Sequence, residues 1–161
     1  MIDPKQFYAL VCKPTLLYLG LYSESAAKLV MGTAVQESGL VYLHQLGNGP
    51  ARGVYQMEPE TFRWLFNSWV HNRAELYDKL ASLLGDWRAG QSPETELDGN
   101  LYFATAMCRV RYLAVQASLP DARNLSGLAQ YWKQYYNTPA GAGTVEQWLN
   151  NYNRHLAGIE W

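Results

Sequence analysis

The amino-acid sequence predicts a mainly α-helical protein that forms one domain over residues 1–161, with at most a small β-hairpin. Apolar residues recur at three- and four-residue steps in most segments, which is the spacing of one helix face. Glycine, proline and other turn-forming residues separate these segments. The length of 161 residues and the hydrophobic content of 48% suit a single domain with a sizeable core, so disorder is not expected.

The first predicted helical segment begins at Asp3-Pro4 and runs to about Leu21. We expect an interruption at Pro14, because the proline ring removes a backbone donor and disfavours a helical conformation at Lys13. Ser23 is the expected N-cap of the second helix, residues 24–37, because its hydroxyl can accept a hydrogen bond from the first turn.

Residues 39–57 contain four glycines and a proline and are expected to form a loop, with room for a short hairpin. Pro59 stands where the first turn of a helix tolerates proline, and it begins a helix that includes Trp69. Residues 90–99 form another loop, which is too short to separate two domains. The later segments with helical periodicity are residues 74–87, 101–119, 128–136 and 145–156. We expect the longest of them, 101–119, to be the central helix and to end at Pro120.

The charge balance argues against two classes of partner. The chain has 13 basic and 14 acidic residues, a formal net charge of −1, and no block of like charge. The sequence therefore contains no basic patch to which nucleic acid or an anionic membrane surface would bind. No stretch approaches the ~18 apolar residues of a membrane span, so membrane insertion is not expected. Six Trp and twelve Tyr favour a carbohydrate-binding cleft, which uses aromatic faces and Tyr hydroxyls.

The N-terminus has no recognisable signal peptide, because the apolar run over residues 7–12 is short and is followed by Lys13-Pro14. We therefore expect Cys12 and Cys108 to be buried, unpaired thiols rather than a disulfide. The histidines are far apart and the cysteines form no CxxC pair, so neither a metal site nor a cofactor is expected.

Glu37, at the end of the second predicted helix, is the most informative residue. The positions on its helix face are apolar or small: Ala26, Val30, Thr33 and Ala34. A carboxylate on an apolar face is costly to ionise, so its pKa should rise and it should hold a proton near neutral pH. Such an acid suits cleavage of a glycosidic bond, where it protonates the departing oxygen. A solvent-facing or capping Glu is the alternative from periodicity alone.

Three segments together resemble the lytic transglycosylases of the lysozyme-like superfamily. Gln36-Glu37-Ser38-Gly39 is similar to that family's Glu-Ser motif, and residues 53–61 are similar to its Gly-Leu-Met-Gln-x-x-Pro-x-Thr segment. Tyr135-Tyr136-Asn137, followed by Thr138-Pro139-Ala140-Gly141, is similar to its Ala-Tyr-Asn-Ala-Gly motif. The segments follow the family's order and span most of the chain.

The resemblance implies a lysozyme-like fold and cleavage of the β-1,4 bond between N-acetylmuramic acid and N-acetylglucosamine in peptidoglycan glycan strands. In this family one Glu donates a proton and then takes one back, while the substrate closes a 1,6-anhydro ring. Glu37 would be the catalytic residue. Five further residues are assigned by the resemblance to substrate binding: Ser38, Tyr55, Gln56, Tyr136 and Asn137.

A lysozyme-type hydrolase, which uses two carboxylates, remains the alternative. Glu58 is the possible second carboxylate, although a surface or helix N-terminal role fits it better. The sequence also departs from the family pattern. Tyr55 replaces the usual Met, Tyr135 replaces the leading Ala of the third motif, and residues 138–140 replace its Ala-Gly.

A peptidoglycan enzyme without an export signal needs another route to the cell wall. A bacteriophage virion would provide one, so we expect an enzyme that opens the wall locally during genome ejection and acts in the periplasm. Other phage virion proteins would then be partners. Two alternatives stay open: a phage endolysin or muramidase released from the host cytoplasm, and a structural tail or head–tail protein that keeps the fold without the activity.

Overall fold

The computed structural model describes residues 1–85 and 91–161. Helices make up 62% of the chain, and the described residues contain no strand, which confirms the predicted mainly α fold. Two isolated bridges, His44–Arg52 and Arg52–Met57, are the only β pairing within the described ranges. They lie in the loop where a small hairpin was expected. No helix in this part of the chain is long and apolar enough to span a membrane.

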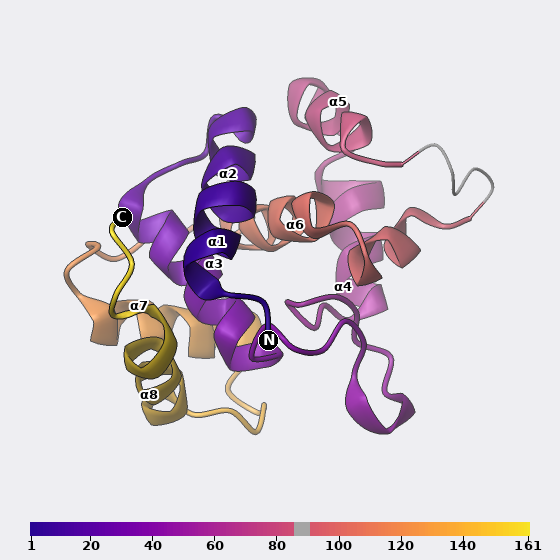
Figure 1. Cartoon of the computed structure of the whole chain (residues 1–161). Helices are drawn as coiled ribbons and strands as arrows, with labels where there is room; N and C mark the ends of the chain where they lie inside the picture. The colour runs from indigo at the N-terminus through magenta and orange to yellow at the C-terminus, as the bar shows by residue number, and fades with distance from the viewer. Residues whose placement is uncertain (86–90) are drawn as a thin grey trace.

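The helical elements follow one another along the chain, joined by turns and loops (Figure 1). The α-helices are α1 (Pro4–Phe7), α2 (Lys13–Leu19), α3 (Glu24–Glu37), α4 (Pro59–Trp64), α5 (Ala74–Ser82), α6 (Leu101–Leu113), α7 (Leu125–Trp132) and α8 (Val145–Leu156). Wider π-helical turns are η1 (Tyr8–Cys12), η3 (Leu65–Trp69) and η6 (Lys133–Asn137). The 3-10 turns are η2 (Leu46–Asn48) and η5 (Pro93–Asp98).

The expected interruption at Pro14 is wrong, because α1, η1 and α2 run on without a break. Lys13 is helical, with φ −59° and ψ −49°, and its N–H bonds to the carbonyl of Tyr8. A π turn shifts the hydrogen bonds by one residue, which gives the proline ring room and removes the need for its missing donor. Thr15 Oγ1 donates to the Val11 carbonyl at 2.7 Å in the same turn.

Helix α3 begins as predicted, with Ser23 Oγ accepting a hydrogen bond from the Ala26 N–H at 3.0 Å. Helix α6 ends at Leu113, six residues before the expected end. The chain then turns, and the carbonyl of Ala117 accepts a hydrogen bond from the Tyr131 hydroxyl at 2.8 Å, so tertiary contacts end the helix earlier than its apolar pattern suggests. The predicted 90–99 loop contains η5, while Trp87 and Gly90 lie outside the described residues.

Helix α6 crosses the middle of the molecule, as expected for the central helix (Figure 1). Residues 103–110 are all buried. Cys12 and Cys108 are buried free thiols, as predicted. Helices α3 and α8 pack closely because Gly32 has no side chain: a Cβ there would lie 2.0 Å from the Trp148 ring. This close approach fixes the end of α3, and so Glu37, against α8.

Candidate active site

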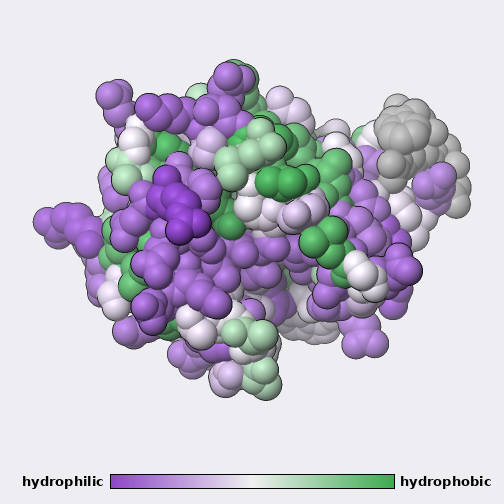
Figure 2. Space-filling model, turned by 60° about the horizontal axis from the view of Figure 1, so that its bottom comes forward, coloured by the Kyte–Doolittle hydropathy of each residue, from purple (hydrophilic) through white to green (hydrophobic). Residues whose placement is uncertain are grey.

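Glu37 lies at an open cleft of about 680 Å³. The end of α3, the loop 39–57 and one side of α8 form its walls, and Asn151 and His155 come from α8. Asn151 Nδ2 donates to Gln36 Oε1 at 2.9 Å, which joins two of these walls. Figure 2 is turned to show the side of the molecule where α8 and the loop lie in Figure 1, and hydrophilic residues cover most of the centre of that face. The cleft is large enough and polar enough for a sugar chain.

The Glu37 carboxyl is held by a tryptophan. Trp132 of α7 is fully buried, and its Nε1 donates to Glu37 Oε1 at 2.9 Å. Burial raises the pKa of Glu37 to about 7, against the opposing effects of the Trp132 hydrogen bond and the positive charge of Arg111. Desolvation therefore outweighs two interactions that favour the charged form. The result is a carboxyl that is largely protonated just below neutral pH, next to an open cleft.

Ser38 shapes the chain after Glu37 rather than contacting its carboxyl. Ser38 is buried, and its Oγ donates to the carbonyl of Val54 at 2.7 Å. The same oxygen accepts a hydrogen bond from the Leu40 N–H at 3.2 Å. Ser38 thus ties the end of α3 to the 53–57 segment, although it also borders the cleft. Its hydroxyl is already occupied, so a positioning role fits it better than sugar binding.

Gln56 is brought to the cleft by a tight turn. Gly53 has φ +72°, and a Cβ at this position would lie 2.3 Å from the Leu97 carbonyl oxygen, so only glycine fits. Gln56 also has a positive φ, +46°, and its Nε2 donates to the Gly53 carbonyl at 2.8 Å. This bond holds the amide at the cleft wall, where its oxygen can accept from a ligand.

The loop carrying this turn is anchored at its far side. The guanidinium of Arg52 pairs with Asp98 of η5, and His44 Nδ1 lies 3.5 Å from the same carboxylate. Backbone hydrogen bonds in both directions join Arg52 and Met57, at 3.0 and 2.9 Å. These contacts fix the backbone of the loop that carries Gln56.

The structure places Tyr55 and Tyr136 differently from the expectation. The Tyr55 side chain is buried, and its hydroxyl is 3.0 Å from Thr105 Oγ1, so its side chain cannot bind substrate. The Tyr136 hydroxyl donates to the Tyr55 carbonyl at 2.7 Å and does not bond to Glu37. Tyr136 still borders a small cavity of about 40 Å³, which shares Gln56 with the large cleft.

Asn137 is turned toward its own loop. Its Oδ1 accepts a hydrogen bond from Lys133 Nζ at 2.8 Å, and Lys133 also donates to the Gly141 carbonyl at 2.7 Å. Asn137 borders neither the large cleft nor the small cavity. The Asn137 side chain therefore closes the loop after η6 and does not lie at the cleft of Glu37.

Glu58, the possible second carboxylate, lies between the large cleft and the small cavity. It is exposed, precedes α4 and makes no capping hydrogen bond with its side chain. It borders the cleft of Glu37 and the small cavity of Tyr136. Glu58 thus lies on the surface at the N-terminus of α4, which agrees with the alternative role, and its exposed carboxylate also borders the cleft.

Sequence reasoning missed two residues at this site. They are Trp132, which bonds to Glu37, and Arg111, whose charge acts on the same carboxyl. Trp132 is 95 positions from Glu37, so no local pattern could pair them. Its indole N–H was the available signal, because a buried Trp usually finds a hydrogen-bond acceptor.

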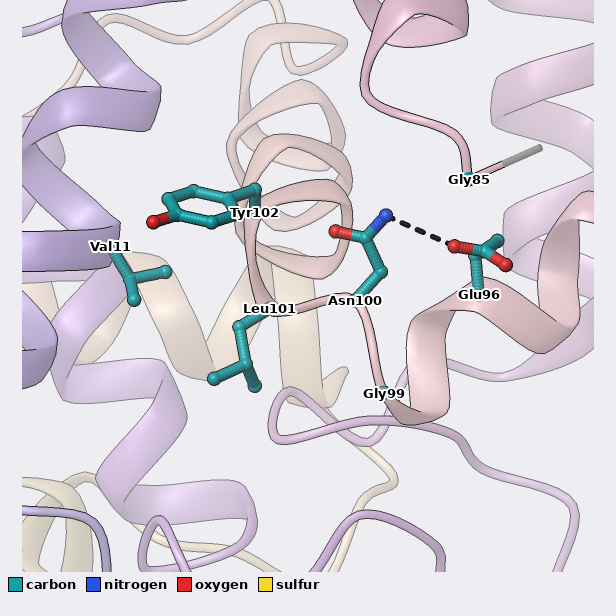
Figure 3. Close-up of a pocket in the computed structure, with 7 residues that line it drawn as sticks. All are labelled: Val11, Gly85, Glu96, Gly99, Asn100, Leu101 and Tyr102. Atoms are coloured by element: carbon teal, nitrogen blue, oxygen red, sulfur yellow. Dashed lines mark hydrogen bonds between the residues drawn. The ribbon is translucent and has the colours of Figure 1, made fainter. Parts of the chain in front are cut away.

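A second cavity, of about 450 Å³, lies at the start of α6. Figure 3 shows Asn100 directed at Glu96, to which its Nδ2 donates at 3.0 Å. The residues around this cavity are Val11, Gly85, Glu96, Gly99, Asn100, Leu101 and Tyr102. None of the predicted site residues is among them. Across residues 1–85 and 91–161, no group of three or more His, Cys, Asp or Glu side chains is arranged to hold a metal ion.

Comparisons with protein-family models, with curated proteins and with solved structures gave no match. Inference about function therefore depends on the chemistry of this cleft.

Proposed function

We propose that this protein is a lytic transglycosylase with a lysozyme-like fold, which cleaves the β-1,4 bonds of peptidoglycan glycan strands through Glu37. The observation that carries the proposal is a carboxyl with a pKa of about 7 at the wall of an open, polar cleft. Gln56 on the neighbouring wall and the three motif-like segments add support.

The proposed reaction needs one carboxyl. The protonated Glu37 gives its proton to the bridging oxygen as the bond between that oxygen and C1 of the N-acetylmuramic acid unit breaks. The substrate's own 6-hydroxyl then bonds to C1, and its proton returns to the Glu37 carboxylate. The products are a strand ending in a 1,6-anhydro sugar and a strand with a free 4-hydroxyl, and Glu37 is protonated again. A pKa near the working pH suits a group that both gives and takes a proton.

Mass spectrometry of the fragments released from purified peptidoglycan tests the proposal. Anhydro ends are the expected result. Reducing ends in their place would indicate a lysozyme-type hydrolase. Release of no fragment would contradict any glycan-cleaving activity and favour a structural virion protein.

One observation supports the hydrolase as a second candidate: Glu58 borders the same cleft as Glu37, is exposed, and makes no capping hydrogen bond with its side chain. With a single working carboxyl, Glu58→Gln should reduce turnover by less than about tenfold and leave the anhydro products unchanged. A loss as deep as that of Glu37→Gln, with reducing ends in the wild type, would show that two carboxylates work together.

We further propose that the enzyme is carried in a phage virion. The proposed substrate lies outside the cytoplasmic membrane, and a virion that passes its genome through the cell wall would bring the enzyme to it. Protein analysis of purified particles tests this, and detection only in lysed cells would favour an endolysin.

A further inference from the structure

Arg111 of α6 is a charged group whose contacts suggest a ligand. Its Nη2 donates to the Tyr136 carbonyl at 3.0 Å, and its guanidinium lies over the Tyr136 ring, 4.9 Å from the ring centre. These contacts use one donor and one face of the group. Its Nε is buried and has no hydrogen-bond partner among the described residues.

An arginine in this setting is energetically unusual. Arginine is a cationic residue, and partial burial of a charge is costly unless the charge is paired. The ion pairs formed in the described part of the chain do not include Arg111. The Tyr136 ring offsets some of the cost through its π face, and the carbonyl offsets more. A carboxylate would offset the rest, because its two oxygens match the fork of guanidinium donors.

The position of Arg111 connects this charge to the proposed reaction. Arg111 borders the small cavity of about 40 Å³, together with Gln56 and Glu58. Both of these residues also border the large cleft of Glu37. The small cavity is therefore a side recess of the cleft. It has room for little more than the terminal atoms of a substrate group.

We propose that Arg111 is a specificity-determining residue that binds a carboxylate of the glycan strand at this side recess. The inference rests on the proposed function and narrows its substrate class to acidic glycans. In peptidoglycan such a carboxylate comes either from the lactyl group of N-acetylmuramic acid, where no peptide is attached, or from an acidic residue of the attached peptide.

Glu58 acts against this binding. Its carboxylate lies at the same recess, is exposed, and forms no ion pair with Arg111. It should repel an incoming anion while remaining hydrated. Removing its charge with Glu58→Gln should therefore tighten binding of an acidic ligand, whereas removing the charge of Arg111 should weaken it.

Binding of three tetrasaccharides of alternating N-acetylglucosamine and N-acetylmuramic acid tests the proposal, measured by calorimetry on protein carrying Glu37→Gln to prevent cleavage. The first has free lactyl carboxylates, the second has them converted to neutral methylamides, and the third carries an acidic dipeptide on each lactyl group. We expect the first or the third to bind about tenfold more tightly than the second, the order of a hydrogen bond to a charged group. Preference for the first identifies the lactyl source, and preference for the third identifies the peptide.

Variants then assign the preference to Arg111. Arg111→Gln should abolish the preference, Arg111→Lys should keep part of it, and Arg123→Gln is the matched control. Arg123 is exposed and paired with Asp121, so its variant has the same change of net charge away from the cleft. Equal binding of all three sugars by the wild-type recess, or equal effects of the two Gln variants, would overturn the proposal. Failure to bind any of the sugars would instead overturn the proposed function itself, and the inference with it.

Discussion

At the scale of single residues, the surroundings of Glu37 set its proton affinity, and the proposed catalysis depends on that affinity. Burial raises its pKa to about 7, while Trp132 and Arg111 act in the opposite direction. The raised pKa was expected from the apolar helix face on which Glu37 lies. The hydrogen bond from Trp132 was not, because it joins two segments that only the tertiary fold brings together.

The raised pKa has a consequence for stability. A folded-state pKa of about 7, against an ordinary value of 4.5, means that the folded protein binds this proton more tightly than the unfolded chain. The stabilisation is complete below pH 4.5 and is lost as the pH rises through 7. Relative to Glu37→Gln, the wild type should lose up to about 3 kcal/mol of unfolding free energy between pH 4.5 and 8. Urea unfolding of both proteins across this range measures it, and parallel pH curves would contradict the raised pKa.

Tyr136 makes a different prediction from the one its motif suggested. Its hydroxyl is the donor to the buried carbonyl of Tyr55, so Tyr136→Phe leaves that carbonyl unpaired. The expected loss of unfolding free energy is about 1–3 kcal/mol. Tyr135→Phe is the control, because the Tyr135 hydroxyl forms no hydrogen bond with residues 1–85 or 91–161. Equal stability of the two variants would show that the Tyr136 hydrogen bond is unimportant. A loss of activity without a loss of stability would restore the original substrate-binding role.

At the scale of helices and loops, most of the pattern was readable from the sequence. The Ser23 cap, the span of α8 and the start of α4 at Pro59 follow from capping and proline rules. The failures have local causes. A π turn allows α2 to pass through Pro14, and tertiary contacts end α6 at Leu113 although its apolar spacing continues.

The contact between α3 and α8 gives a direct test of how the cleft is built. A methyl group at Gly32 would lie 2.0 Å from the Trp148 ring, so Gly32→Ala must separate the helices or displace the ring. We expect a loss of about 1–3 kcal/mol, although alanine is the better helix former. Thermal unfolding measures it, with Gly99→Ala as a control, because a Cβ at Gly99 meets no atom within 4 Å. A stabilised Gly32→Ala protein would mean that the two helices do not pack this closely.

At the scale of the whole molecule, the candidate site combines segments that are far apart in the chain. The end of α3 supplies Glu37, the loop 39–57 supplies Gln56, and α7 supplies Trp132. The motif segments predicted the first two of these from the sequence. The third motif assigned Asn137 to substrate binding, whereas its side chain bonds to Lys133 within its own loop, because a short motif does not determine which way a side chain turns.

The central claim is that the fold keeps Glu37 protonated beside a cleft that we propose binds glycan strands. The most direct measurement is the rate of fragment release from purified peptidoglycan, as a function of pH, for the wild type, Glu37→Gln and Glu146→Gln. Glu146 is an exposed residue of α8 that does not line the cleft. Glu146→Gln therefore makes the same chemical change at a position with no proposed role in catalysis.

The account predicts that Glu37→Gln lowers the rate by at least 10²–10⁴-fold, the contribution typical of general acid–base catalysis, while Glu146→Gln has the wild-type rate. The wild-type rate should also fall as the pH rises above about 7, where Glu37 loses its proton. Wild-type turnover by a folded Glu37→Gln protein would contradict the account.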